Sequence, residues 1–155
     1  MKTVYLETTV FSFYYDERPA SSYRRDVTRE WWDQESHRYY LVTSYMTLEE
    51  VGQPVYPNWE KVRALADGVP VLQNTPEIEG IVNIYLEHCL MPQNDMGDAF
   101  HLAMACYYEV DYLLTWNCKH IANANKYEHI RGVNLRLGLL TPLLITPEQL
   151  FTEEE

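Results

Sequence analysis

Acids and amides stand at the ends of two neighbouring elements in the segment from Asn94 to His120. Asp98 falls in the first turn of an expected helix, where its carboxylate is close to the positive end of the helix dipole. Residues 112–115 are typical of a short buried strand that delivers Asn117 to the edge where open α/β sheets bind ligands. Carboxylate and amide oxygens suit hard divalent cations. The segment therefore indicates a metal-binding site.

Two more acids occupy equivalent places in a regular alternation of strands and helices. Glu7 follows a strand over residues 3–6, and Glu50 lies on a helix over 44–51 that follows a strand over 39–43. This alternation predicts a three-layer α/β/α fold around a central, mainly parallel five-stranded sheet. The other expected elements are strands at 69–72, 112–115 and 143–145, helices at 21–35, 57–67, 76–90 and 118–122, a helix from Asp98 and a helical turn from Thr146.

Length and composition favour one globular domain. A chain of 155 residues with 46% hydrophobic residues can bury a core, and we expect the domain to span 1–150, followed by an acidic tail over 151–155. The three cysteines lack CxxC spacing, which argues against a disulfide framework and a zinc knuckle. Without a basic, apolar leader or a run of about 18 apolar residues, we expect a cytoplasmic protein that does not enter a membrane.

The net charge of −11 bears directly on any role with nucleic acid. Backbone phosphates attract Lys and Arg and repel carboxylates, so this charge disfavours RNA binding by the surface as a whole. Carboxylates gathered around divalent cations are neutralised locally, however. An acidic surface also suits a basic protein partner.

The four polar positions carry motifs that resemble those of the PIN-domain ribonucleases, in particular the VapC-type toxins of bacterial toxin-antitoxin pairs. The likeness spans nearly the whole chain. Glu7 begins Glu-Thr-Thr-Val, where the family has D-T/S-x-V, and Glu50 is the acid in a match to S-x-x-T-x-x-E-L that runs from Ser44 to Val51. Asp98 begins Asp-Ala-Phe-His-Leu-Ala-Met-Ala, close to D-A-x-H/I-x-A-x-A. Asn117 ends Leu-Leu-Thr-Trp-Asn, where many members have L-x-T-x-D.

This resemblance implies a Mg²⁺- or Mn²⁺-dependent endoribonuclease. Glu7 and Asp98 would bind the cation, Glu50 would bind it or orient its water, and Asn117 and Asp95 would complete the shell. Further side chains are expected to contact the ligand carboxylates or the RNA: Thr8, Thr115, His101 and His120. The family also implies strand order 3-2-1-4-5, a homodimer, and inhibition by a cognate antitoxin protein.

Two departures from the family pattern keep a second function open. Glu7 is longer than the family's Asp by one C–C bond, about 1.5 Å, and Asn117 lacks a negative charge. The alternative is a catalytically impaired PIN-fold module that binds RNA or a protein partner. A phosphohydrolase of small esters is a third reading, disfavoured because the chain has neither a D-x-D-x-T motif nor a P-loop.

Several candidate residues also have purely structural interpretations. Asp95 fits a helix cap better than a metal ligand, and His101 fits the core or an interface about as well as the site. His120 is equally consistent with an exposed helix end. The arginines at 24, 25 and 29 stand on one expected helix, where they would contact phosphate or a partner's carboxylates.

Overall fold

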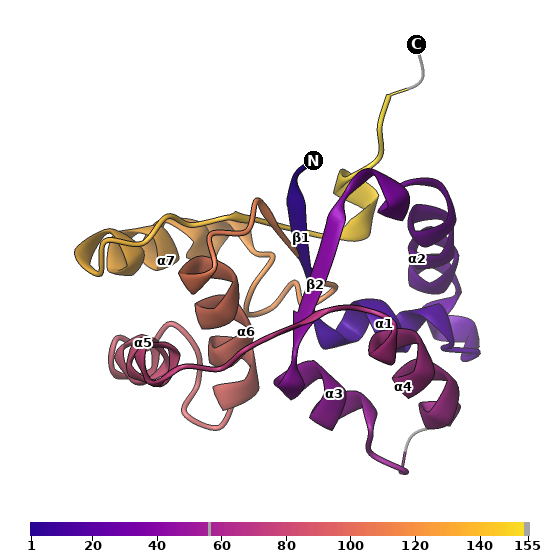
Figure 1. Cartoon of the computed structure of the whole chain (residues 1–155), viewed down its shortest axis with the longest axis horizontal. Coiled ribbons are helices and arrows are strands. Elements are labelled where there is room, and N and C mark those ends of the chain that lie inside the picture. Colours follow the sequence, from indigo (N-terminus) through magenta and orange to yellow (C-terminus); the bar gives the residue numbers. More distant parts are fainter. Residues whose placement is uncertain (56, 154–155) are drawn as a thin grey trace.

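A five-stranded parallel sheet forms the centre of the structure, a computed structural model that describes residues 1–55 and 57–153 (Figure 1). The strand order is β3-β2-β1-β4-β5, and every neighbouring pair is parallel. The predicted fold class and strand order are both confirmed. The strands are β1 (Thr3–Leu6), β2 (Tyr40–Ser44), β3 (Val71–Leu72), β4 (Tyr112–Leu114) and β5 (Leu143–Ile145).

Helices cover both faces of the sheet because successive side chains of a strand point to opposite faces. In β1, Val4 and Leu6 pack into one core cluster and Tyr5 packs into the other. The first cluster is covered by α1 (Thr8–Tyr14), α2 (Ser22–Gln34) and α4 (Trp59–Asp67), and the second by α5 (Pro76–Glu87), α6 (Met96–Tyr107) and α7 (Ala124–Arg136) (Figure 1).

Helix α3 (Tyr45–Val51) borders both layers. Its Val51 packs into the cluster of α1, α2 and α4, whereas Tyr45 and Met46 contact the cluster of α5 and α6. Helix α3 also contacts α1, α4 and α6 directly. A polar side chain on this helix can therefore reach groups at the start of α6.

Local signals explain where the most clearly predicted helices begin. Thr75 caps α5 by accepting a hydrogen bond from the Ile78 amide, and Pro76 occupies the first helical position.

Every residue of α6 from Ala99 to Cys106 is buried, so this helix is packed on all sides. Its first turn, which carries Asp98, remains partly accessible.

Other elements differ from the prediction. Helices α1 and α7 were not expected, and the helix expected over 118–122 is wrong. That segment is a turn, in which the Ile121 and Ala122 amides both donate to the Asn117 carbonyl before Asn123 caps α7. The helix expected from residue 57 begins at Trp59. Short 3₁₀ turns occupy Pro19–Ser21, Ser36–Arg38 and Pro147–Gln149, the last as predicted.

The C-terminal segment stays attached beyond residue 150. Phe151 packs against the core, and the amide and hydroxyl of Thr152 each donate to the buried Glu35 carboxylate at 2.9 Å. Glu154 and Glu155 of the expected acidic tail lie outside the described residues. Within the described chain the three cysteines are free, and none of its helices has the length and apolar character needed to cross a bilayer.

Candidate active site

Glu7 links the end of β1 to the start of α1. Its Oε1 accepts hydrogen bonds from the Thr9 amide at 2.9 Å, from the Thr9 hydroxyl, and from the Thr115 hydroxyl at 2.8 Å. The carboxylate therefore caps α1, and Thr115, the residue after β4, donates to the same oxygen. Burial raises the pKa of Glu7, and this outweighs the lowering by the His101 charge and by the hydrogen bonds.

Glu50 reaches from α3 to the buried side chain of His101 on α6. The Glu50 Oε1 lies 2.7 Å from His101 Nε2, and the Tyr5 hydroxyl lies 2.7 Å from His101 Nδ1. The Thr8 hydroxyl is 3.3 Å from Nε2. Burial lowers the pKa of His101, but the Glu50 hydrogen bond and the charges of Glu7, Glu50 and Asp98 raise it above its ordinary value.

Asp98, Asp95 and His120 form a second group at the start of α6. His120 Nδ1 lies 2.8 Å from Asp98 Oδ2 and 3.3 Å from Asp95 Oδ2. Ligand atoms of the three residues lie within 4.8 Å of one another. Asp95 stands at the N-cap position of α6, as expected, but its side chain makes no capping hydrogen bond and is directed to His120 instead.

Asn117 and Thr115 hold the turn that carries His120. The Asn117 side-chain oxygen accepts the His120 amide at 3.0 Å, and the Asn117 amide donates to the Thr115 hydroxyl at 2.9 Å. Thr115 in turn donates to Glu7. Asn117 thus caps a turn, and through this turn it places His120 against Asp98.

These contacts place the nine residues named from the sequence in two groups, one around His101 and one that runs from Glu7 through Thr115 and Asn117 to His120 and the two aspartates. Within the described residues, three carboxylates of these groups share one feature: a single oxygen makes the hydrogen bonds and the other makes none. They are Glu7, Glu50 and Asp98. Each comes from a different element, and the charges of all three act on His101. Hard oxygen donors left free in this way fit Mg²⁺ or Mn²⁺.

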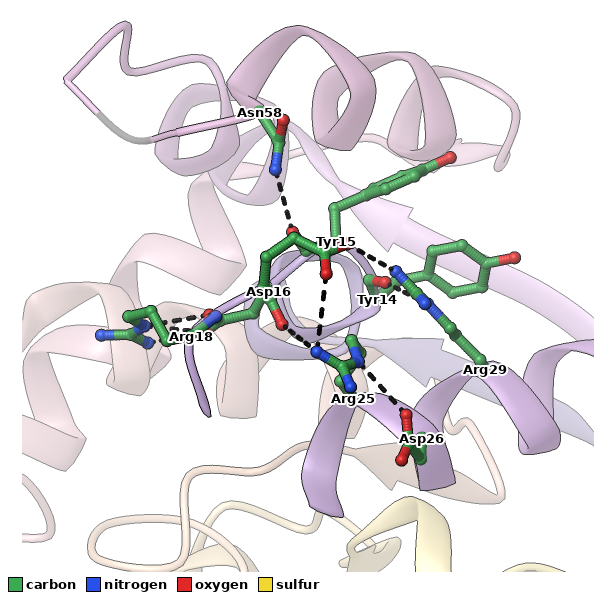
Figure 2. A network of polar contacts seen from close by, with 9 residues as sticks. Tyr14, Tyr15, Asp16, Arg18, Arg25, Asp26, Arg29 and Asn58 are labelled. Atoms are coloured by element: carbon green, nitrogen blue, oxygen red, sulfur yellow. Dashed lines mark hydrogen bonds and ion pairs between the residues drawn. The ribbon is translucent and has the colours of Figure 1, made fainter. Parts of the chain in front are cut away.

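The arginines of α2 divide into two roles. Arg29 Nε donates to the Tyr14 carbonyl at 2.7 Å and Arg25 Nη1 to the Asp16 carbonyl at 3.4 Å, as Figure 2 shows. Figure 2 also shows Asn58 donating to the Tyr15 carbonyl. Because the last carbonyls of a helix lack partners within it, these donors secure the end of α1. Arg25 and Arg29 therefore hold the fold together.

Arg24 is placed differently. Its guanidinium lies 5.4 Å from the ring centres of both Phe13 and Trp116, and its side chain is exposed. Among the described residues no carboxylate lies within 4 Å of it, whereas Arg25 and Arg29 both contact Glu17. Trp116 directly precedes Asn117, so Arg24 offers an unpaired cation beside the acidic set.

A cavity of about 810 Å³ opens beside the acids, between α1, α3 and the start of α4. Of the candidate residues, Thr8 and Glu50 belong to its wall. Its volume lies in the range of about 300–1,000 Å³ that is usual for ligand pockets. Phe13, Tyr15 and Trp59 supply aromatic surface to the same wall.

Three residues of the site were missed by sequence reasoning. Tyr5 was assigned to a strand, and its alternation with Val4 and Leu6 is the signal that sends its side chain to the α6 face. Gly97 is close enough to Glu50 that an added Cβ would lie 3.3 Å from Oε1. Lys126 belongs to the unpredicted α7. Burial lowers the pKa of its ammonium, although Asp98 and Asp95 raise it.

Comparison with known proteins adds no family assignment. No model of a known protein family matches the chain, and no curated protein matches it.

Proposed function

We propose that the chain is a metal-dependent endoribonuclease of the PIN-domain class, which hydrolyses phosphodiester bonds of single-stranded RNA. The observation that carries this proposal is that Glu7, Glu50 and Asp98 each leave one carboxylate oxygen without a hydrogen bond among the described residues, while the charges of all three act on His101. Carboxylate oxygens are the ligands that Mg²⁺ and Mn²⁺ prefer. The resemblance of the four motifs to PIN-domain ribonucleases supports the same assignment.

Each residue of the proposed site has a separate role. Bound Mg²⁺ or Mn²⁺ supplies Lewis acidity toward the scissile phosphate and a nucleophile at neutral pH. Glu7 and Asp98 hold the cation through their free oxygens, and Glu50 either binds it or accepts a hydrogen bond from the attacking water. His120 and Asp95 support Asp98. Arg24 contacts a backbone phosphate of the RNA.

The biological setting that we propose is that of a VapC-type toxin, which acts in the cytoplasm as a homodimer and is inhibited by a cognate antitoxin. The net charge of −11 suits a basic protein partner. This part of the proposal predicts that the adjacent reading frame encodes a small basic DNA-binding protein. Co-purification of that protein with the chain would test the assignment.

A specific observation favours a second candidate function, the impaired PIN-fold module that binds RNA or protein without cleaving it. Asn117 uses its side-chain oxygen on the His120 amide, so the position where many PIN domains have an acid contributes no charge here. Metal binding separates the two candidates. An active nuclease binds Mn²⁺ through Glu7 and Asp98, whereas the impaired module binds RNA equally well in a chelator.

Cleavage of a labelled single-stranded RNA tests the proposal. The purified protein should cut internal bonds with Mg²⁺ or Mn²⁺ and none with EDTA, and Asp98→Asn should slow cleavage steeply without unfolding the protein. Asp67→Asn is the matched control, because Asp67 lies on α4 and pairs only with Arg63 among the described residues. Asp98→Asn cleaving as fast as the parent would overturn the nuclease assignment. Turnover of p-nitrophenyl phosphate without RNA cleavage would favour a small-ester phosphohydrolase.

A further inference from the structure

We infer that His101 is a positioning residue that orients the carboxylate of Glu50 for the cation, and that Gly97 leaves the space this orientation needs. The inference rests on the proposed function, and it explains how one metal ligand, the Glu50 carboxylate, is held. His101 donates to Glu50 from one side, while the missing side chain at position 97 lets the same oxygen approach α6. Two independent features of α6 thus fix one carboxylate of α3.

A chain of hydrogen bonds gives His101 a definite role. The Ser44 and Tyr5 hydroxyls are 2.7 Å apart, Tyr5 is 2.7 Å from His101 Nδ1, and His101 Nε2 is 2.7 Å from Glu50 Oε1. A carboxylate only accepts, so Nε2 must carry a proton and donate. In the neutral ring Nδ1 accepts from Tyr5, which accepts from Ser44, and in the protonated ring Nδ1 donates to Tyr5, which donates to Ser44. The chain is satisfied in both states, and Nε2 donates to Glu50 in both.

Burial makes this arrangement rigid. Tyr5, Ser44 and His101 are each 0% exposed, so neither the ring nor its hydroxyl partner can turn away into water. Glu50 is different, because 38% of its side chain is exposed. A free glutamate side chain loses rotamer entropy when it is fixed. The contact with His101 fixes it before the cation arrives.

Gly97 leaves room for the Glu50 carboxylate in this position. A Cβ at position 97 would lie 3.3 Å from Glu50 Oε1 and 3.9 Å from its Cδ, so an alanine would require the carboxylate to move by a few tenths of an ångström. Gly97 lies in the first turn of α6, where alanine is otherwise the better helix former. Replacing this glycine therefore separates the effect on stability from the effect on Glu50.

The test measures Mn²⁺ affinity by calorimetry, RNA cleavage and thermal unfolding for three variants. Asparagine at position 101 can reach Tyr5 but not Glu50, whereas glutamine places an amide N–H near the position of Nε2. We expect His101→Asn to weaken Mn²⁺ binding by about 10–100-fold, the usual effect of losing a group that orients a ligand, and His101→Gln to recover most of it. Gly97→Ala should weaken Mn²⁺ binding while unfolding at the same or a higher temperature.

The controls separate this inference from the function on which it rests. His129→Asn changes an exposed histidine of α7 and should leave every readout unchanged. Equal Mn²⁺ affinity of His101→Asn, His101→Gln and the parent would overturn the role of His101. If neither His101 variant folds, Gly97→Ala tests the inference. Mn²⁺ binding by Gly97→Ala as tight as that of the parent would then overturn it. RNA cleavage by Asp98→Asn at the parent rate would instead overturn the proposed function.

Discussion

Replacing Glu7 with glutamine should make the metal-free protein more stable and abolish its metal site. Glutamine keeps the oxygen that accepts from Thr9 and Thr115 and replaces the free carboxylate oxygen with an amide. The side chain is 3% exposed, and its raised pKa shows that burial of the charge outweighs the hydrogen bonds that favour it. The variant removes that cost and, with it, the charge that a cation needs.

The sign of the effect follows from the direction of the pKa shift. A carboxyl whose pKa is raised on folding stabilises the fold below its unfolded pKa of about 4.3 and loses this contribution as the pH rises through the folded pKa. The stability of Glu7→Gln relative to the parent should therefore increase between pH 4 and pH 8. At pH 8 Glu7→Gln should therefore unfold at a higher temperature than the parent, and in a domain of this size each 1 kcal/mol of added stability corresponds to roughly 2–4 °C.

Thermal unfolding in EDTA at several pH values, together with Mn²⁺ calorimetry, tests both halves of this prediction. Glu128→Gln is the control, since Glu128 is exposed on α7 and should change neither readout. A lower unfolding temperature for Glu7→Gln at pH 8 would show that the buried charge is not the dominant cost. Mn²⁺ binding as tight as in the parent would show that Glu7 is no ligand and would favour the non-catalytic binding module.

Three further substitutions test the site and the structure around it. Glu7→Asp keeps the charge and should retain Mn²⁺ binding by calorimetry, whereas a loss would show that the longer side chain is required. Arg24→Ala should weaken RNA binding and reduce the slope of log K against log salt by about 0.7, and Arg131→Ala should leave that slope unchanged. Asp16, whose pKa the Arg18 hydrogen bonds lower to about 2, contributes stability above its unfolded pKa of about 3.9. The destabilisation by Asp16→Asn in chemical unfolding should therefore shrink as the pH falls toward 2, and a constant difference would refute the pair's role.

Local patterns were enough to place the strands and most helices. Residues 3–6 and 143–145 are short apolar runs bounded by polar groups, and they form β1 and β5 with the predicted bounds. Thr75 and the proline after it predicted the start of α5. Prediction failed where the local signal was weak or where one residue had two roles. Glu7 is both a site residue and the N-cap of α1, so the sequence did not reveal that a helix begins there.

The sequence by itself indicated the parallel strand order, and this order sets Glu7, at the end of β1, between the strand that precedes α3 and the strand that follows α6. It did not determine what each carboxylate contacts. His101 meets Glu50 and Tyr5 across 51 and 96 residues of chain, and His120 meets Asp98 across 22. Such contacts depend on how helices pack and on side-chain directions within that packing, which no local pattern encodes. The tertiary structure alone therefore decided which oxygen of each acid is free.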